Sequence, residues 1–467
     1  MIRQISPGQY HLKLFNRGVG LSDRSILLII IALAVLLRLA SAIYQGNNVT
    51  DLPGVYDQIS YDGLARRVVD GFGFSFAEGH WPATRAGEPT AHWSYIYTLY
   101  LAAIYKVFGT YPLIARIFQA FFAGILQTFL IWRIGTRLFD KKIGLIAATL
   151  NAIYIYFFYY AGALVTETFY ITCILWTFDA SFRLVDTDRN TGAPGYLQWL
   201  ELGLAVGLTV LLRQSFFLFL PFLFIWIWWN VRVSENSRWK QLLHWSALQG
   251  LFATTVVLAF MILPFAIRNY RAFGTFVLLN TNAGYVFFWG NHPVHGTSFI
   301  PLLSSGVQYY DLIPTELLPL NEAELDKALL KLGIQFVLDD PVRFLRLSIS
   351  RAEEYFKFYP SANSGLVSNI SRVGSFGIAL PFILYGLWLE MTQVWRSQTL
   401  AEKWSVILLL CFVLVYTSIH LLSWTLIRYR LPVDAVLLIF AALGFKTLIY
   451  NLRGWIRMRT SSLSTSR

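Results

Sequence analysis

Long apolar runs separated by short polar or basic segments make up most of this chain. Ten of these runs are clear candidates for membrane spans, and each is expected to be helical because a polar backbone cannot face lipid unsatisfied. They cover residues 26–44, 113–132, 143–160, 165–182, 198–212, 215–230, 246–265, 376–389, 406–422 and 435–450. The pattern therefore predicts an all-α polytopic membrane protein with about ten transmembrane helices.

A further apolar run, residues 95–108, is short and rich in tyrosine, and the basic loops decide its placement. If it crosses the membrane, the basic stretch 133–142 falls on the outer face and the later basic loops alternate wrongly. If it lies in the interface, every basic loop and both termini face the cytoplasm, as the positive-inside rule requires. We therefore expect an interfacial helix over 95–108, within a first outer loop at 45–112.

This topology divides the chain into five segments. They are a cytoplasmic N-terminus (1–25), a membrane module with the first seven spans (26–265), a large extracytoplasmic loop (266–375), the last three spans (376–450) and a basic cytoplasmic tail (451–467). Inside the large loop, residues 321–337 have helical periodicity, and Asp340-Pro341 is expected to end that helix and start another.

Composition supports the membrane class and excludes others. Charged residues are 14% of the chain and hydrophobic residues 56%, whereas soluble domains typically carry about 25% charged residues. The net charge of +12 comes from basic clusters at the ends of apolar runs, so we expect membrane lipids and no nucleic acid as partners. Both cysteines lie in apolar runs, which leaves neither a disulfide framework nor a thiolate metal site.

The stretch VYDQISYDGLARRVVDG, residues 55–71, concentrates charge just after the first span. A helical period places Tyr61, Leu64, Ala65, Val68 and Val69 on one side, with Asp62, Arg66, Arg67 and Asp70 facing water on the other. Asp57 stands just before this helix. It is either an acid of the N-cap type or a functional group.

Glu167 is a second acid in an unusual place, at the outward junction between two predicted spans. A carboxylate within hydrocarbon costs about 2.5 to 3.5 kcal/mol on insertion scales, so such residues usually face a cavity or a partner. The alternative is an interfacial acid that reaches the headgroups. Under the predicted topology Asp57 and Glu167 reach the same leaflet, where they could share one site and divide base and orienting roles.

Spaced motifs over almost the whole chain resemble those of GT-C glycosyltransferases of the bacterial dolichyl-phosphate-mannose-protein mannosyltransferase and ArnT-like kind. The motifs are Asp57-Gln58 with Tyr61, Leu64-Ala65 and Gly71, then Thr166-Glu167, PFAIRNYRAFGTFVLLNTNAGYVFFWGNHPVHG at 264–296, and RYRLPVDAVLL at 428–438. Two positions depart from the pattern. Gln58 stands where relatives carry a second acid, and His92 precedes the interfacial run where relatives often carry a basic residue and a proline.

The resemblance implies a GT-C fold and an inverting transfer of a sugar from a polyprenyl-phosphate-linked donor to an acceptor hydroxyl on the extracytoplasmic face. Asp57 would be the general base. Glu167 would orient the acceptor or the base, or act as the second acid beside a loosely bound divalent cation, although no cofactor is certain. The implied donor-phosphate ligands are Arg268, Arg428 and Arg430, and the implied substrate contacts are Tyr61, His92, Asn269 and Tyr429.

Other functions stay open at this point. A transporter or lipid flippase would predict acids or broken helices near the bilayer midplane, and the predicted spans carry few charges there. An O-antigen ligase-like transferase would have a similar outer loop, but the Asp57 motif would be unexpected in it. A non-catalytic scaffold would explain Gln58 and His92. The sugar is open, and the acceptor could be a lipid, a glycan or a protein.

Overall fold

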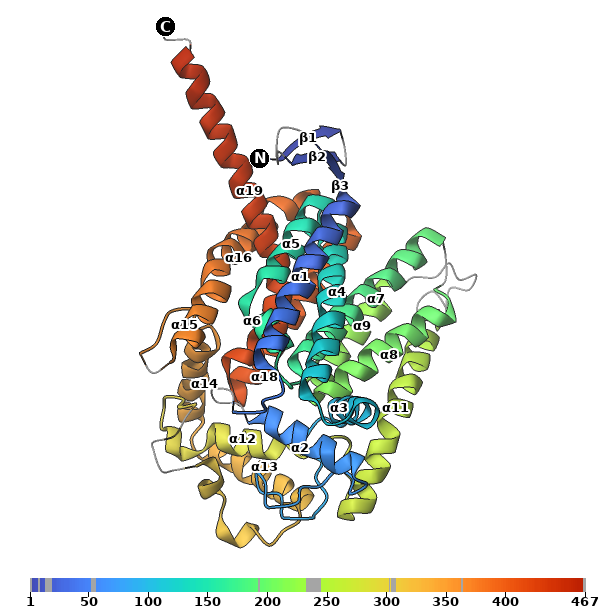
Figure 1. Cartoon of the computed structure of the whole chain (residues 1–467), viewed down its shortest axis with the longest axis vertical. Coiled ribbons are helices and arrows are strands. Elements are labelled where there is room, and N and C mark those ends of the chain that lie inside the picture. Colours follow the sequence, from blue (N-terminus) through green and yellow to red (C-terminus); the bar gives the residue numbers. More distant parts are fainter. Residues whose placement is uncertain are drawn as a thin grey trace.

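The structure, a computed structural model, describes residues 2–6, 9–12, 19–51, 56–191, 194–231, 245–301, 303, 308–362 and 364–464. Helices dominate these residues, and a small antiparallel sheet, β1-β2-β3 (Ile2–Ser6, Gln9–Leu12 and Val19–Ser22), precedes the first of them. Figure 1 shows the long helices running together in one bundle, with both chain ends at the same end of it.

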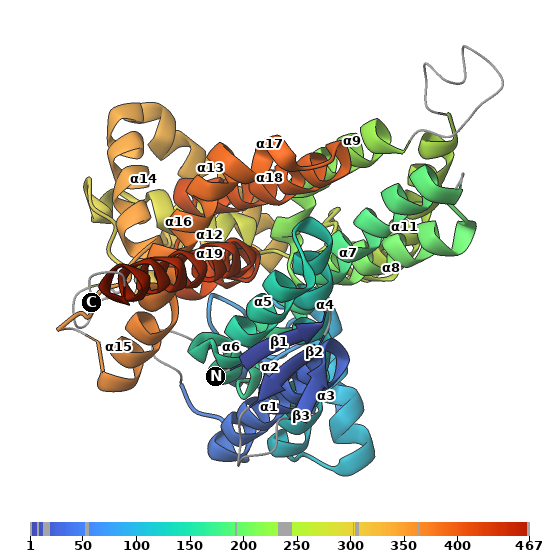
Figure 2. The ribbon, with the colours of Figure 1, turned by 90° about the horizontal axis from the view of Figure 1, so that it is seen from above.

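The bundle contains the helices that carry the predicted apolar runs. They are α1 (Asp23–Gln45), α4 (Pro112–Leu138), α5 (Lys141–Ile153), α6 (Ile155–Ala161), α7 (Glu167–Thr191), α8 (Tyr196–Leu212), α9 (Leu220–Asn230), α11 (Trp245–Phe273), α16 (Ile378–Leu389), α18 (Leu400–Leu422) and α19 (Leu431–Ser464). Short elements connect them, including η1 (Gln214–Phe219), α15 (Leu366–Arg372), η5 (Val373–Gly377), η6 (Glu390–Val394), α17 (Trp395–Ser397) and η7 (Ile427–Arg430). Seen from above, α8, α9 and α11 lie on one side of the bundle, and α14 (Pro341–Tyr355) and α15 lie on the other (Figure 2).

The protein is a multi-pass membrane protein, but its span count is less simple than the ten apolar runs. Among the described residues, six helices are long and apolar enough to cross a membrane, and a seventh qualifies if α5 and α6 form one span bent by 55°. The run at 198–212 lies on a shorter helix, and the run at 215–230 divides between η1 and α9. The bundle is therefore all-helical, and two of the predicted spans fall on apolar helices shorter than 18 residues.

Close backbone contact holds the last spans together. A Cβ atom built on Gly386 of α16 would lie 1.8 Å from the carbonyl oxygen of Phe440 in α19, and one on Gly444 would lie 2.4 Å from that of Phe382. Small residues that let backbones approach are typical of helix pairs inside membranes. Any larger side chain at either glycine would push α16 and α19 apart.

Outer helices gather beyond the other end of the bundle. They are α2 (Asp57–Val69), α3 (Tyr95–Phe108), α12 (Ala283–Asn291), α13 (Glu322–Asp339) and α14 (Pro341–Tyr355), with short 3-10 turns η2 (Pro293–His295), η3 (Tyr309–Leu312) and η4 (Thr315–Leu317). The helix α3 has the predicted bounds. The predicted boundary between α13 and α14 is confirmed too, because the Asp340 carboxylate accepts from the Arg343 backbone N–H as the cap of α14.

The prediction for the outer face of α2 is partly wrong. Asp62 is buried, with its carboxylate accepting from the Tyr105 hydroxyl at 2.6 Å and from Arg66 Nε at 2.7 Å. Tyr105 belongs to α3, which packs against α2 and covers the side that the helical period assigned to water. Of the charged residues on that side, Arg66 and Asp70 are exposed.

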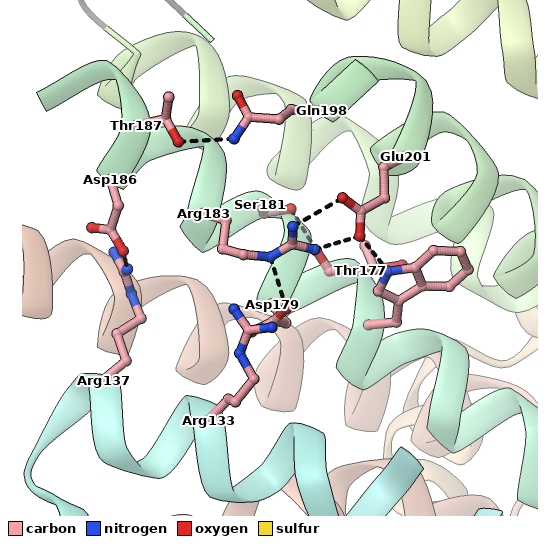
Figure 3. A network of polar contacts seen from close by, with 11 residues as sticks. Arg133, Arg137, Thr177, Asp179, Ser181, Arg183, Asp186, Thr187, Gln198 and Glu201 are labelled. Carbon is pink, nitrogen blue, oxygen red and sulfur yellow. Dashed lines mark hydrogen bonds and ion pairs between the residues drawn. The ribbon is translucent and has the colours of Figure 1, made fainter. Parts of the chain in front are cut away.

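A network of ion pairs ties α4, α7 and α8 together far from the outer helices (Figure 3). Asp179 accepts from Arg133 Nε at 3.2 Å and from Arg183 Nε at 3.0 Å, so it links α4 to α7. Arg183 Nη1 also donates to Glu201 Oε2 of α8 at 2.9 Å. Three helices are thereby joined at this end of the bundle by paired charges.

Candidate active site

Four charged side chains from distant parts of the sequence converge where the bundle meets the outer helices. Arg428 Nη1 of η7 lies 2.5 Å from Asp57 Oδ2 and 3.3 Å from Glu167 Oε1. Arg213, directly after α8, also pairs with Glu167 Oε1. The Asp57 side chain is 19% exposed, whereas that of Glu167 is 1% exposed. The structure therefore brings both predicted acids into one cluster, in which Asp57 is the more accessible carboxylate.

Helix ends position this cluster. Asp57 and Glu167 are the first residues of α2 and α7, where the helix dipole and free backbone N–H groups favour a carboxylate. Asp57 is not the N-cap, because that position belongs to Tyr56, which makes no side-chain capping bond. Arg213 follows the last turn of α8, and its Nε donates to Thr166 Oγ1 at 2.9 Å. The carboxylate of Asp57 is thus directed to Arg428 rather than to its own helix.

Aromatic rings line the guanidinium groups. The Tyr429 ring centroid lies 5.2 Å from Arg213 Cζ and 5.1 Å from Arg428 Cζ, within the range of cation–π contacts. His420 of α18 stacks on Tyr429 with ring centroids 4.8 Å apart. The predicted substrate contact Tyr429 therefore lies in the cluster. Arg213 and His420 lie there too.

Several buried polar atoms of the cluster have no hydrogen-bond partner within the described part of the chain. They are Glu167 Oε2, Arg428 Nε and His420 Nε2. Buried polar groups in folded proteins are nearly always paired. Unlike most buried polar groups, these three atoms therefore retain unused hydrogen-bonding capacity inside the cluster.

Electrostatics sets the protonation state of the groups on α2. Burial alone would raise the pKa of Asp57, but the charge and hydrogen bond of Arg428, aided by Arg213, bring that pKa below its ordinary value. Burial and the Asp57 charge raise the pKa of Tyr61, one turn further along the helix. Tyr61 therefore stays a neutral phenol beside an ionised Asp57.

Gln58, which replaces the acid expected from the resemblance, is buried and fully engaged. Its Oε1 accepts from Arg116 Nη2 at 3.2 Å and from the Leu164 backbone N–H at 3.5 Å. Its Nε2 donates to the carbonyl oxygen of Thr50. A carboxylate could not make this last bond, so the amide is suited to holding α2 against α4 and the turn that precedes Glu167.

Three predicted site residues serve the outer loops instead of the cluster. The Arg268 guanidinium donates to the carbonyl oxygens of Thr90 at 2.8 Å and Phe74 at 3.1 Å. Asn269 is buried and donates to the Leu279 carbonyl oxygen at 2.8 Å. His92 is buried with Nδ1 3.1 Å from the Thr281 carbonyl oxygen, and burial lowers its pKa, so it is not a cation.

Arg430 is also placed differently from the prediction. It is fully buried, with Nε 2.9 Å from Asp434 Oδ1 and Nη1 donating to the Tyr355 carbonyl oxygen at 2.6 Å. Asp434 in turn accepts from the Tyr154 hydroxyl at 2.7 Å. Two residues after Arg428, this arginine ties α19 to α14 and to the break between α5 and α6, and it is not available to a phosphate.

Known proteins match this chain in sequence over one region. Residues 94–260 match the family model described as dolichyl-phosphate-mannose-protein mannosyltransferase. That region contains Glu167 and Arg213 but neither Asp57 nor Arg428. None of the curated proteins matches the chain.

Solved structures match nearly the whole chain in fold. One is the archaeal oligosaccharyltransferase AglB from Archaeoglobus fulgidus in complex with an inhibitory peptide and a dolichol-phosphate, at 16% identity and a TM-score of 0.53, covering 94% of this chain and 52% of that chain. The A. fulgidus oligosaccharyltransferase in complex with Zn and sulfate matches at 17% identity and a TM-score of 0.50, covering 92% and 49%. ArnT from Cupriavidus metallidurans bound to undecaprenyl phosphate is similar at 14% identity, covering 89% and 77%, but its TM-score of 0.37 is too low to establish a shared fold.

These likenesses differ in what they establish. The chain spans about half the length of the archaeal enzymes, and at such low identity the likeness to them establishes the fold alone. The family match covers a continuous third of the chain inside that fold. Residues 94–260 are thus similar to the dolichyl-phosphate-mannose-protein mannosyltransferase family, and the fold of the chain is the GT-C fold that it shares with the archaeal oligosaccharyltransferase.

Proposed function

We propose that this protein is an integral membrane glycosyltransferase. It transfers a sugar from a polyprenyl-phosphate-linked donor to an acceptor hydroxyl, with inversion at the anomeric carbon. The observation that carries this proposal is the convergence of Asp57, Glu167, Arg213 and Arg428 at one end of the bundle. The GT-C fold supports it, as does the dolichol-phosphate bound by the archaeal relative. A flippase or a scaffold has no such support.

The cluster faces the extracytoplasmic side in this proposal. Basic residues gather at the opposite end of the bundle, including Arg133, Arg137, Lys141 and Lys142, and such residues favour the cytoplasmic side. Both termini lie at that end too (Figure 1). Residues 1–25 and 451–467 are then cytoplasmic, and residues 45–112 and 266–375 form the outer loops.

Arg428 and Arg213 hold the donor phosphate. A guanidinium group binds phosphate oxygens through two parallel N–H bonds, and both side chains lie beside Tyr429 with Arg428 Nε unpaired. Glu167, at 1% exposure between the two arginines, fixes their orientation. Charge that develops on the leaving polyprenyl phosphate is stabilised by these pre-positioned cations.

Asp57 is the general base. Free of donor, its carboxylate is held by Arg428 and has a low pKa. A phosphate that draws Arg428 toward itself weakens this ion pair, which raises the pKa of Asp57 as the donor binds. The acceptor oxygen then attacks C1 of the sugar, Asp57 takes the acceptor's proton, and the bond from C1 to the phosphate oxygen breaks.

Donor turnover by protein reconstituted in nanodiscs tests this function. A panel of polyprenyl-phosphate sugars is offered with and without candidate acceptors, and released polyprenyl phosphate is measured by mass spectrometry. Since general-base help contributes about 10² to 10⁴ in rate, Asp57→Asn should lose activity on that scale. Asp70→Asn is the matched control, because Asp70 is an exposed acid at the end of the same helix. Equal activity of the two variants would remove Asp57 as the base, and no turnover of any donor would refute the transferase.

A further inference from the structure

We propose that this site works without a divalent metal ion, because the Arg428 guanidinium takes the position between Asp57 and Glu167 that a shared cation would need. The inference rests on the proposed function for its catalytic part. The fold itself admits metal, since a solved archaeal relative holds Zn. Metal binding therefore depends on whether the side chains around Asp57 and Glu167 can coordinate a divalent cation.

A single nitrogen atom contacts both acids. Arg428 Nη1 lies 2.5 Å from Asp57 Oδ2 and 3.3 Å from Glu167 Oε1. Divalent cations bind carboxylate oxygens at about 2.0 to 2.6 Å and need several ligands. An ion held by both carboxylates would have to displace Arg428, whose side chain is 6% exposed and packed beside the Tyr429 ring.

The charges of the cluster already balance. Asp57 and Glu167 are matched by Arg428 and Arg213, each paired with at least one of the acids. In the donor-free site, a divalent ion added to these four groups would leave two uncompensated positive charges in largely buried surroundings. Unpaired charge in such surroundings is strongly unfavourable.

A third ligand is missing as well. The side-chain amide of Gln58, the residue after Asp57, is already hydrogen-bonded to Arg116, Leu164 and Thr50. Across the residues that the structure describes, no group of three His, Cys, Asp or Glu side chains is placed to hold a metal ion. The glutamine at position 58 and the bridging position of Arg428 therefore both argue against a bound metal ion.

In this scheme the negative charge that develops on the leaving phosphate is compensated by arginine side chains alone. The acceptor's proton passes to Asp57, and the electron pair of the broken C1–O bond stays on the phosphate oxygen. Arg428 and Arg213 stabilise that oxygen in place of a metal ion. Arg428 is therefore a catalytic residue in this scheme, in contact with both the base and the leaving group.

Metal binding and metal dependence are measured on the full-length protein in nanodiscs. After equilibration with Mn²⁺ and removal of free ion, we expect less than a tenth of an equivalent bound by electron paramagnetic resonance. Donor turnover should change less than two-fold after treatment with EDTA. One equivalent of Mn²⁺ that is lost in Asp57→Asn would overturn the inference, as would a ten-fold fall with EDTA that Mn²⁺ reverses.

Arg428→Ala supplies the complementary test. We expect a loss of turnover of at least 100-fold that millimolar guanidinium ion restores in part and Mn²⁺ does not. The control is Arg346→Ala, an exposed arginine on α14, for which guanidinium should change nothing. Restoration by Mn²⁺ instead of guanidinium would contradict the inference. If Arg428→Ala fails to fold, Arg428→Lys replaces it, with retained EDTA resistance expected. Absence of all turnover would defeat the proposed function, and Mn²⁺ binding would still decide the metal question.

Discussion

The two arginines of the sequence Arg428-Tyr429-Arg430 should separate activity from stability when each is changed to glutamine. Arg430 and its partner Asp434 have side chains 0% and 1% exposed. Removing one partner of a buried ion pair costs about 3 to 5 kcal/mol, because the other charge is left uncompensated. Arg430→Gln should therefore lose much of the stability of the folded protein.

Arg428→Gln should behave in the opposite way. Glu167 keeps its pairing with Arg213, and Asp57, at 19% side-chain exposure, can be hydrated. The stability loss is therefore smaller than for Arg430→Gln. The lost phosphate contact should slow turnover about 10²- to 10³-fold, the scale of one deleted transition-state donor.

Both variants are compared in one preparation. Thermostability is read as the temperature at which half of the detergent-solubilised protein leaves the monodisperse peak in gel filtration, and turnover is read as released polyprenyl phosphate below that temperature. Suppose Arg430→Gln keeps the wild-type midpoint and loses turnover, while Arg428→Gln unfolds early and stays active per folded molecule. The assignment of structural and functional roles to these residues would then be reversed.

Three further outcomes are expected. Because the folded-state pKa of Asp57 is lowered, its carboxylate stays ionised as pH falls past the ordinary aspartate range; the acid limb of kcat/KM should therefore lie below about pH 3.9, and Arg428→Gln should move it upward. An acid limb that Arg428→Gln leaves in place would disprove the coupling. Asn269→Ala should lower the free energy of unfolding by about 1 to 3 kcal/mol for each buried group left unpaired. The unfolding temperature should fall accordingly, and the KM of the folded protein should not change. Gln58→Glu should lower turnover and thermostability together because a carboxylate cannot donate to Thr50, whereas wild-type values for both would deny Gln58 its positioning role.

The convergence of Asp57 and Glu167 could be predicted because it depends on topology. Basic loops fix which side of the membrane each span end faces, and an acid at a span end is costly unless it has a partner. These two rules placed both acids at one end of the bundle without any knowledge of contacts. The helical periods of α2 and α13 were found in the same way, from patterns local to one segment.

Contacts between distant segments could not be predicted. The helical period of α2 predicted on which side of the helix Asp62 lies. It could not predict that Tyr105 of α3 covers that side and donates its hydroxyl to Asp62. Arg428 and Arg430 look alike in the sequence, and only the turn of η7 directs one to Asp57 and the other to Asp434. The pairing of Arg213 with Glu167 could not be predicted either, because the two residues lie 46 positions apart in the sequence.

The ion pairs at the far end of the bundle have a mechanical consequence for the site. Glu167 and Asp179 are twelve residues apart along α7, and Glu201 and Arg213 are twelve residues apart across α8, which is about 18 Å in each case. Arg213 joins Glu167 at one end of this antiparallel pair, and Arg183 joins Glu201 at the other. An ion pair therefore joins the two helices near each end, and neither helix can slide along the other without breaking one of these pairs. Any displacement of α7 at the site therefore carries α8, and with it Arg213, in the same direction.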